Sequence, residues 1–585
     1  MLVRWRNWNS KNATFTVRES DQRATRNSFH SPVSRQTGKV PRAQINFGGN
    51  AVNQDFKLEF VLSVEPGSMC FATPAKHENA VESGQPGGRI TKERADLAGT
   101  HDGSRHKGSR IAQQMDSSDT PNMKAKTQPT GKTSSAETRN HSTELQKRLR
   151  GRVIGEDNAG YDRARRIWNG KIDRKPRLIA QCLDQGDVIA CVQFAREREF
   201  RLAVKGNGHA VAGTAICQEG LVVDLSMMKG VRVNPQELTA WAASGAVLGE
   251  LDHATQAFHL AVPTGTDSEV GISGLALGGG NGWLMGAFGA TCDNLLSVDL
   301  ITAEGKPLIA NESANEDLFW AVTGGGGNFG IVTSFEFRAH RLGPTVVAGA
   351  LLYPLDQARE VLRAFRSFAH EAPDPLTVYP CLICLDDGTP VLAMAACYAG
   401  PVGEGERAVL PLKQLGRPMA DQLKPMPFLE WQSAFDAARP FGRRCAIRSH
   451  FMHEIEDDFI EVLLAGFQRA PSRFSAVILE HCHGAIARVD PQATAFALRK
   501  NPYHFEILAF WDNPEETEAN IHWTIDYFAQ TSRFSSGEVY VNSLDEGEGN
   551  RIQEAYGLNY ERLREIKQKY DPDNFFHCNQ NIAPA

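Results

Sequence analysis

Residues 204–213, VKGNGHAVAG, form a glycine-rich loop that begins at the end of RLAVKG, a run typical of a β-strand. Gly206 and Gly208 permit positive φ angles and a close approach of the backbone to another group, and Asn207 tolerates the left-handed region better than most residues. Successive N–H groups in such a loop form a concavity that suits a pyrophosphate. By itself a G-x-G loop is equally consistent with an ordinary turn, and His209 with an ordinary hydrogen-bonded side chain.

The segments around this loop alternate between strand and helix. LIAQCLD, from Leu178, predicts a strand, and residues 186–200 predict an amphipathic helix with Asp187 as its N-cap. GLVVDLS, from Gly220, predicts the next strand. Strand, helix and strand within about thirty residues indicate a βαβ unit with a parallel strand pair. The helix has an apolar face that carries Val188, Val192 and Ala195.

Two further glycine-rich loops follow. Residues 262–296, VPTGTDSEVGISGLALGGGNGWLMGAFGATCDNLL, contain glycine too often for an ordinary helix or strand. Residues 317–337, DLFWAVTGGGGNFGIVTSFEF, place four glycines before Asn328-Phe329-Gly330 and a strand. Three such loops within about 140 residues favour a backbone threaded past a bulky, flat group over a set of ordinary turns.

Together these loops resemble the FAD-binding domain of the vanillyl-alcohol oxidase and p-cresol methylhydroxylase (PCMH) superfamily, and above all its berberine bridge enzyme-like branch. The resemblance runs from about Pro176 to the C-terminus, where YGLNYERLREIKQKYDPDNFFHCNQNIAPA, from Tyr556, is similar to that branch's signature. It implies an α+β fold with a two-subdomain PCMH-type FAD-binding domain at 172–343. An α+β substrate domain with an antiparallel sheet is expected at 344–535, and a segment returning to the FAD domain at 536–585.

Residues 1–145 differ from the rest in composition. From Gly84 to Arg148 the chain is rich in Ser, Thr, Lys, Asp, Gly and Gln and has hardly an aromatic residue. Such a stretch buries too little apolar surface to offset the entropy lost on ordering. We therefore expect a disordered or poorly ordered N-terminal extension.

Overall composition limits the class of protein. A chain of 585 residues with 41% hydrophobic and 23% charged residues indicates two or more globular domains. The net charge of -6 argues against nucleic acid as the main partner, and no apolar run is long enough to predict a membrane span. The sequence leaves the oligomeric state open.

The eleven cysteines are odd in number and lack the spacing of a secreted disulfide framework. This pattern favours a reducing, cytoplasmic compartment. Cys381 and Cys384, in TVYPCLICLDDGTPVLAMAACY, lie in what we expect to be two strands around an Asp-Asp-Gly turn. Residues three apart on a strand face opposite sides, so these thiols should pack in the core and share no metal. We expect no metal site.

The family resemblance implies FAD as the cofactor. It implies that residues 205–210 hold the pyrophosphate and that the His209 ring is bonded to the flavin 8-methyl group. Some members add a second link from a cysteine, but Asp267 stands at that position, and a carboxylate cannot form the thioether. One link is therefore expected. The other cofactor contacts that the resemblance implies are Lys205, Gly206, Asn207, Gly208, Ala210, Gly213, Gly265, Thr266, Val270, Gly271, Gly274, Gly278, Gly279, Gly330, Ile331 and Asn581.

The predicted strand YHFEILAFW, residues 503–511, alternates between two faces. One face carries His504, Glu506, Leu508 and Phe510, and the other is wholly apolar and should pack on helices. A solvated strand face is an equal alternative on the pattern alone. By resemblance, Glu506 occupies the pocket position at which a glutamate serves as base. Further candidates for catalytic residues are His504 and Tyr540. Further candidates for residues of the pocket are His481, His483 and Arg499. Ser543 replaces the second tyrosine of the family's Tyr-x-Asn-Tyr motif, so no tyrosinate base is available there.

The implied reaction is oxidation of a CH–OH or CH–NH group of a small molecule, with proton transfer to Glu506 and hydride transfer to flavin. In the family a leucine three residues after the second-linkage position closes the space that oxygen uses. Val270 is the corresponding residue here, and its smaller side chain predicts an oxidase. The alternatives are a dehydrogenase that uses another electron acceptor and a flavin-binding protein with little turnover. The motifs do not define the substrate.

Overall fold

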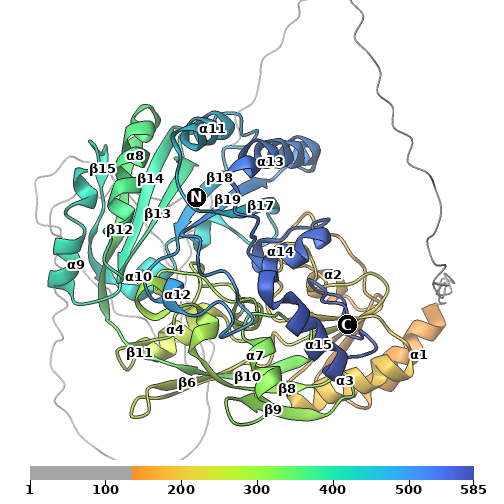
Figure 1. Cartoon of the computed structure of the whole chain (residues 1–585). Coiled ribbons are helices and arrows are strands. Elements are labelled where there is room, and N and C mark those ends of the chain that lie inside the picture. The colour runs from red at the N-terminus through yellow and green to blue at the C-terminus, as the bar shows by residue number, and fades with distance from the viewer. Residues whose placement is uncertain (1–134) are drawn as a thin grey trace, which may run out of the picture. The chain divides into compact units, whose positions relative to one another are not determined.

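The computed structural model describes residues 135–585 (Figure 1). The N-terminal part of this region contains a mixed four-stranded sheet and an antiparallel five-stranded sheet. The first has the order β1 (Arg152–Gly155), β2 (Leu178–Gln181), β4 (Leu221–Asp224), β3 (Leu202–Lys205). The second has the order β5 (Val231–Asn234), β6 (Thr239–Ala243), β10 (Ile331–Arg338), β8 (Leu295–Ile301), β9 (Pro307–Asn311). A two-stranded ribbon joins β7 (Leu260–Ala261) to β11 (His340–Arg341).

The predicted βαβ unit is present, with one difference in the strand order. Strands β2 and β3 are joined through α3 (Gln185–Glu197), but each pairs in parallel with β4, which lies between them. The apolar face of α3 is buried, as predicted. The N-cap prediction was wrong: Asp184 caps the helix by accepting from the Asp187 N–H. The Asp187 carboxylate instead accepts from the backbone N–H groups of Arg150, Gly151 and Leu183, because it points toward the chain that leads into β1.

The folded region begins earlier than the sequence predicted. Residues 1–134 of the expected extension lie outside the described residues, but residues 135–145 belong to helix α1 (Ser135–Gln146). Leu145 is fully buried in the cluster that also contains the apolar face of α3. Just beyond the helix, Arg148 forms ion pairs with Glu144 and Glu197. The composition of this segment is polar apart from one buried leucine, so the sequence did not predict the helix. The expected end of the N-terminal extension, at residue 145, is therefore about ten residues too late.

An eight-stranded antiparallel sheet dominates the second half of the described chain. Its faces differ as the alternation in β19 predicted, because Phe505, Ile507, Ala509 and Trp511 pack in a buried cluster with the helices above (Figure 1). Those helices are α8 (Ala358–Ala369), α11 (Asp457–Phe467) and α13 (Thr517–Thr531). The strand order is β15 (Ala420–Asp421), β12 (Thr345–Pro354), β14 (Pro390–Tyr398), β13 (Leu376–Cys384), β18 (Ala476–His481), β19 (Tyr503–Trp511), β17 (Arg444–Met452), and β16 (Lys424–Pro427) also pairs with β12.

Strands β13 and β14 form the antiparallel pair expected around the Asp-Asp-Gly turn. Cys381 is buried and Cys384 is partly exposed, and all ten cysteines of residues 135–585 are free thiols. Shorter helices connect the sheets: α2 (Tyr161–Ala164), α4 (Leu248–Gln256), α5 (Ile272–Leu277), α6 (Met285–Phe288), α7 (Glu316–Val322), α9 (Val402–Ala408), α10 (Phe428–Gln432) and α12 (Ala485–Arg488).

The C-terminal segment packs on the third glycine-rich loop. It contains α14 (Ile552–Tyr556) and α15 (Tyr560–Tyr570) and then runs without regular structure to residue 585. Lys567, fully buried, donates to the Asn328 carbonyl and pairs with Asp571. The Asn328 side chain in turn accepts from the Ile582 N–H. This buried network fastens the end of the chain beside residues 326–328.

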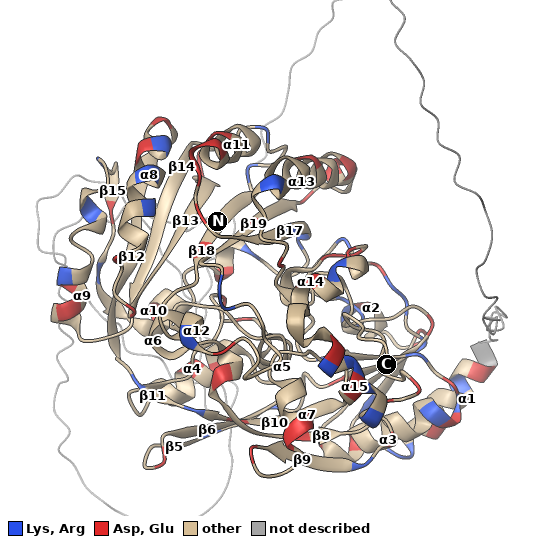
Figure 2. Cartoon of the chain, viewed as in Figure 1, with Lys and Arg blue, Asp and Glu red and all other residues tan. Residues whose placement is uncertain are grey.

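The charged residues are spread over the surface with both signs interspersed. Figure 2 shows basic and acidic residues together on α1 and α15, in keeping with the small net charge. Among residues 135–585, no helix combines the length and the apolar character that a bilayer crossing requires.

Candidate active site

All three glycine-rich loops meet the C-terminal segment and the face of β19 that points away from the helices at one cavity. The first loop contributes residues 206–211 to its wall, the second contributes residues between 265 and 281, and the third contributes residues between 326 and 332. Strand β19 adds His504, Glu506, Leu508 and Phe510. The C-terminal segment adds residues 540–543, Tyr556, Phe576 and 578–580. Segments more than 300 residues apart therefore enclose a single space.

Glycines allow the first two loops to approach each other closely. A Cβ atom on Gly206 would lie 2.6 Å from the Ser273 hydroxyl, and one on Gly271 would lie 2.8 Å from the Asn207 amide nitrogen. The Asn207 amide donates to the carbonyls of Gly245 and Ala246, at 3.0 and 3.3 Å. Gly208 adopts a φ of +78°, which an L-residue rarely adopts. The glycines thus leave the loop backbones themselves as the wall of the cavity.

His209 lies in this wall with its ring stacked on Trp168. The ring centroids are 5.6 Å apart at an interplanar angle of 20°, and Trp168 also makes an edge contact with Phe510 of β19. Burial lowers the pKa of His209 to about 4, although Asp436 opposes the shift. The imidazole is therefore neutral at physiological pH and keeps a nitrogen lone pair available for bonding.

Two carboxyl groups meet near the second-linkage position. Asp267 is buried in the cavity wall. Asp436 accepts from the backbone N–H and the hydroxyl of Ser268. Burial raises the pKa of Asp436, and the neighbouring Asp267 adds to the rise. Among the described residues that line this cavity, the only thiol is Cys578, which belongs to the C-terminal segment.

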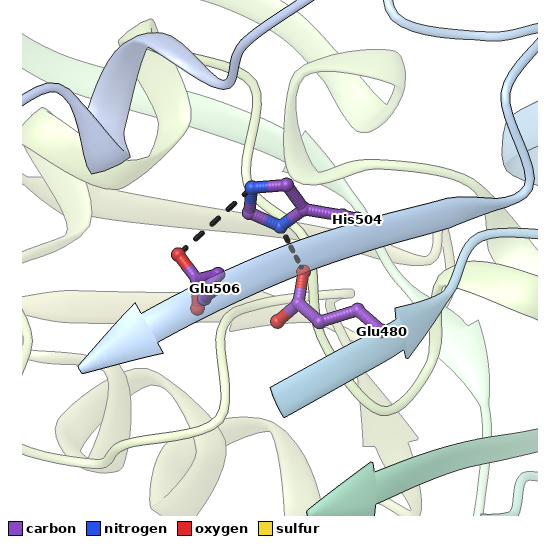
Figure 3. A group of neighbouring side chains, drawn as sticks. All are labelled: Glu480, His504 and Glu506. Carbon is purple, nitrogen blue, oxygen red and sulfur yellow. Dashed lines mark hydrogen bonds and ion pairs between the residues drawn. The ribbon is translucent and has the colours of Figure 1, made fainter. Parts of the chain in front are cut away.

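Glu480, His504 and Glu506 form a chain of charged groups on the cavity side of the sheet (Figure 3). His504 Nδ1 lies 2.9 Å from Glu480 Oε2, and His504 Nε2 lies 3.9 Å from Glu506 Oε1. The ring is fully buried, and its Nε2 makes no hydrogen bond within the described part of the chain. The Ser543 hydroxyl donates to Glu506 Oε1 at 2.6 Å. One ring nitrogen of His504 and one carboxylate oxygen each of Glu480 and Glu506 all lie within 4.8 Å of one another.

Burial and mutual attraction act in opposite directions on these groups. Burial raises the pKa of Glu506, and the nearby His504 and Arg439 only partly offset this effect. Burial lowers the pKa of His504, but the Glu506 and Glu480 carboxylates outweigh it, so that the net shift of the His504 pKa is upward. The arrangement therefore favours a protonated imidazole between two carboxyl groups, and it makes the Glu506 carboxylate a stronger proton acceptor than a carboxylate in water.

Tyr540 stands at the edge of the same group. Its hydroxyl accepts from the Gly280 N–H at 2.8 Å and from the Asn542 amide at 2.9 Å, and its ring makes an edge contact with His504. Burial raises the pKa of Tyr540. The hydroxyl is therefore neutral at physiological pH and fixes the cavity wall near Gly280.

Several residues named from the sequence lie outside the lining of the cavity. The Lys205 ammonium pairs with Asp224 at 3.1 Å and donates to the Ala164 carbonyl. Arg499 forms a buried ion pair with Asp293 at 2.6 Å. His481 and His483 stack on each other, with ring centroids 4.1 Å apart. Of the predicted cofactor contacts, those absent from the lining are Lys205, Gly213, Gly278, Gly279 and Asn581.

Two charged lining residues were missed by the sequence reasoning. Glu480 lies opposite His504 in the pairing of β18 with β19, and it is the only acidic residue of β18. An acidic residue within an otherwise apolar strand was the available signal. Arg439 makes no side-chain hydrogen bond or ion pair within residues 135–585, and it follows the short helical turn Asp436–Ala438 that contains Asp436. No local pattern marked it.

The loops, the neutral histidine and the buried acid–base group together define an FAD-binding oxidoreductase. The model of the FAD binding domain matches residues 176–311, and the model described as berberine and berberine like matches residues 539–583. An uncharacterized FAD-linked oxidoreductase of Bacillus subtilis, YgaK, is 33% identical over 448 residues, which are 75% of this chain and 98% of the relative. The chain belongs to the berberine bridge enzyme-like FAD-linked oxidoreductases, within the PCMH and vanillyl-alcohol oxidase family.

Two solved relatives are informative. The (R)-6-hydroxynicotine oxidase of Paenarthrobacter nicotinovorans is 27% identical over 461 residues, which are 74% of this chain and 97% of the relative. The crystal structure of 6-hydroxy-D-nicotine oxidase from Arthrobacter nicotinovorans superimposes with a TM-score of 0.70 over 75% of this chain and 98% of that chain. Phl p 4, a grass pollen allergen with glucose dehydrogenase activity, shares the fold at 23% identity and a TM-score of 0.69, over 76% of this chain and 99% of that chain. One isoleucine-to-valine variant of Phl p 4 is named a glucose oxidase.

The contact between the first two loops can be tested with Gly271→Ala. The new methyl group would lie within about 3 Å of Asn207, and forcing such a shift in a packed site costs about 1–3 kcal/mol. We expect a lower ratio of flavin to protein absorbance in the purified variant. Gly403→Ala is the control, because a Cβ atom there meets nothing within 4 Å. Full flavin content in Gly271→Ala would show that the loops have room to separate.

Proposed function

We propose that the protein oxidises a CH–OH or CH–NH group of a small molecule, with FAD bonded to His209 and with oxygen as the electron acceptor. The observation that carries the proposal is the Glu480–His504–Glu506 group in the same cavity as the three glycine-rich loops. The names of the relatives, a nicotine oxidase and a glucose dehydrogenase or oxidase, fit an amine or an alcohol substrate.

The residues of the cavity suit FAD. Residues 206–210 offer backbone N–H groups for the pyrophosphate, with Gly208 at positive φ. We assign no such role to the Lys205 ammonium, because it is engaged with Asp224. The neutral ring of His209 supports a single covalent link, since Asp267 supplies no thiol. The other proposed contacts are Gly265, Thr266, Val270, Gly271, Gly274, Gly330 and Ile331, all of which line the cavity.

The proposed domains correspond to the sheets. We assign residues 172–343, which contain the four- and five-stranded sheets apart from β1, to the FAD-binding domain. Residues 344–535 contain the eight-stranded sheet and form the substrate domain. Residues 536–585 return to the third glycine-rich loop through Lys567 and Asn328. The reacting atoms then meet at the boundary between these parts, where β19 faces the loops.

The proposed base is Glu506. When bound, FAD supplies the acceptor for the hydride of the substrate C–H bond. Glu506 takes the proton of the adjoining OH or NH group, for which its raised pKa is suitable. The Ser543 hydroxyl orients the carboxylate. His504, held by Glu480, stabilises the charged form of Glu506 across the 3.9 Å gap, and its Nε2, which makes no hydrogen bond among the described residues, is offered to the substrate heteroatom.

Val270 supports oxygen as the acceptor. Its side chain lies in the cavity wall, three residues beyond Asp267. Phl p 4 is described as having glucose dehydrogenase activity, and its variant with valine in place of an isoleucine is named a glucose oxidase. A valine at a wall position is consistent with the space that oxygen needs beside the cofactor.

Replacement of Glu506 tests the proposed base. Glu506→Gln keeps the shape of the side chain and its contact with Ser543, but it cannot take a proton. Flavin reduction, followed by anaerobic stopped-flow absorbance with a substrate found in an alcohol and amine panel, should slow by about 10² to 10⁴. In the wild type the rate should rise with pH through the raised pKa of Glu506, since only the carboxylate acts as base. This acidic limb should disappear in the variant.

Two results decide whether Glu506 is the base. Glu480→Gln should lower the rate much less than Glu506→Gln, because in the proposed mechanism Glu480 pairs with His504 and does not itself take the substrate proton. A wild-type rate in Glu506→Gln would place the base elsewhere, with His504 and Tyr540 as the next candidates. A protein that no substrate in the panel reduces, with or without an artificial acceptor, would support the flavin-binding alternative.

The oxygen acceptor is tested by Val270→Leu. The additional methylene fills wall space, so reoxidation of the reduced enzyme by oxygen should slow by at least about tenfold, while flavin reduction by substrate is retained. Val204→Leu, at another point of the cavity wall, controls for the added volume alone and should reoxidise normally. If the wild type reoxidises slowly in air and prefers an artificial acceptor, the protein is a dehydrogenase.

A further inference from the structure

A smaller cavity lies next to the FAD cavity and contains two cysteines. Thr214, Cys578 and Asn579 line both cavities. The smaller one is also lined by Cys217, Arg174, Arg201 and His577. Two thiols and three basic side chains therefore surround one space at the point where the C-terminal segment meets the loop between β3 and β4.

The environment of Cys578 stabilises a thiolate. Arg201 Nε donates to Cys578 Sγ at 3.0 Å, and the thiol is partly exposed. The neighbouring Cys217 thiol and the nearby Arg201 and His577 side chains lower the pKa of Cys578 to about 6, against the opposing effect of burial. The Cys578 thiol and burial raise the pKa of Cys217, whose Sγ lies 3.8 Å from the Leu221 carbonyl and 3.9 Å from the Arg201 carbonyl. The pair is thus polarised, with the charge on the accessible sulfur.

A second pair of thiols shows that proximity alone does not have this effect. The sulfur atoms of Cys182 and Cys191 are 3.9 Å apart, and both residues are fully buried. The pKa of Cys182 is raised by its hydrogen bond with Cys191 and by burial, and no arginine contributes to the shift. This pair provides an internal reference within the same chain, because its thiols lie close together but lack both access and a cation.

We propose that Cys578 is a peroxide-reactive thiolate and that Cys217 is its resolving thiol. The Cys578 thiolate attacks one oxygen of hydrogen peroxide, the O–O bond breaks, and the products are a sulfenic acid and hydroxide, which takes a proton to become water. The Cys217 sulfur then displaces the sulfenic hydroxyl, which leaves as water with the Cys217 proton. In sum, two thiols and one hydrogen peroxide give one disulfide and two water molecules.

The disulfide would join the C-terminal segment, which lines the FAD cavity, to the loop that follows β3. Residues 576–580 contribute Phe576, Cys578, Asn579 and Gln580 to the wall of that cavity. Before oxidation these residues are held by hydrogen bonds, such as that from the Asn579 amide to the Gly327 carbonyl. A covalent tie at Cys578 would hold the segment over the cofactor. The inference rests on the proposed oxidase activity only for the source of the peroxide, because added peroxide serves equally well.

Peptide mapping of the holoenzyme tests the disulfide. The fully reduced protein is treated with a small excess of hydrogen peroxide, alkylated and digested without reductant. We expect a Cys217–Cys578 disulfide peptide, while Cys182 and Cys191 remain alkylatable. In Cys217→Ser, Cys578 should be trapped as a sulfenic acid by dimedone, and in Cys578→Ser, Cys217 should stay reduced. A Cys578 that stays reduced in the wild type, or oxidation of Cys182 and Cys191 first, would overturn the proposal.

The role of Arg201 is tested by the pH dependence of alkylation. With reduced protein and iodoacetamide, Cys578 should react with a midpoint near its pKa of about 6. Arg201→Gln, at an exposed position, should shift this midpoint upward by about 1–2 pH units, because the thiolate loses its charged donor. An unchanged midpoint would contradict the assignment. Neither experiment requires a substrate, so their failure is distinguishable from failure of the proposed oxidase activity.

Discussion

The structure depends on the close packing of neighbouring loops against glycine backbones around one cavity. A side chain on Gly206 or Gly271 would collide with the neighbouring loop, and one on Gly282 would lie 1.8 Å from the Thr264 carbonyl. Because these glycines carry no side chain, the Ser273 and Asn207 side chains can pack directly against the backbone of the neighbouring loop. The same closeness brings His209 onto Trp168 and, through Trp168, into contact with Phe510 of β19. The cofactor loops and the substrate strand are therefore positioned by one packed unit.

The largely buried Glu480–His504–Glu506 group carries an energetic cost. Removing two carboxyl groups and an imidazole from water is unfavourable unless each finds a partner. Glu480 has His504, and Glu506 has Ser543, but His504 Nε2 has no hydrogen bond among the described residues. Buried and incompletely satisfied groups of shifted pKa are typical of catalytic sites. This incompleteness supports a reaction at Glu506 better than it supports a purely structural role.

Much of this site could be predicted from the sequence, and the failures share a cause. The glycine loops are local patterns that led to Gly206 and Gly271. The alternation of β19 placed His504 and Glu506 on one face, and the family resemblance then named Glu506 as the base. Glu480 depends on the pairing of β18 with β19, which no local pattern encodes. Lys205 lies next to the loop in sequence, but its side chain is drawn to Asp224 on the neighbouring strand. Helix α1 was missed because a single buried residue, Leu145, anchors a polar segment.

The covalent attachment of FAD to His209 is the central proposal. It accounts together for the neutral histidine, the glycine loop and the absence of a cysteine at the second-linkage position. The direct measurement is denaturation of the purified holoenzyme in acid, followed by proteolysis and mass spectrometry of every flavin-bearing peptide. We expect that the flavin stays with the polypeptide and maps to one residue, His209. Complete release of FAD, or a flavin bonded to a cysteine, would contradict it.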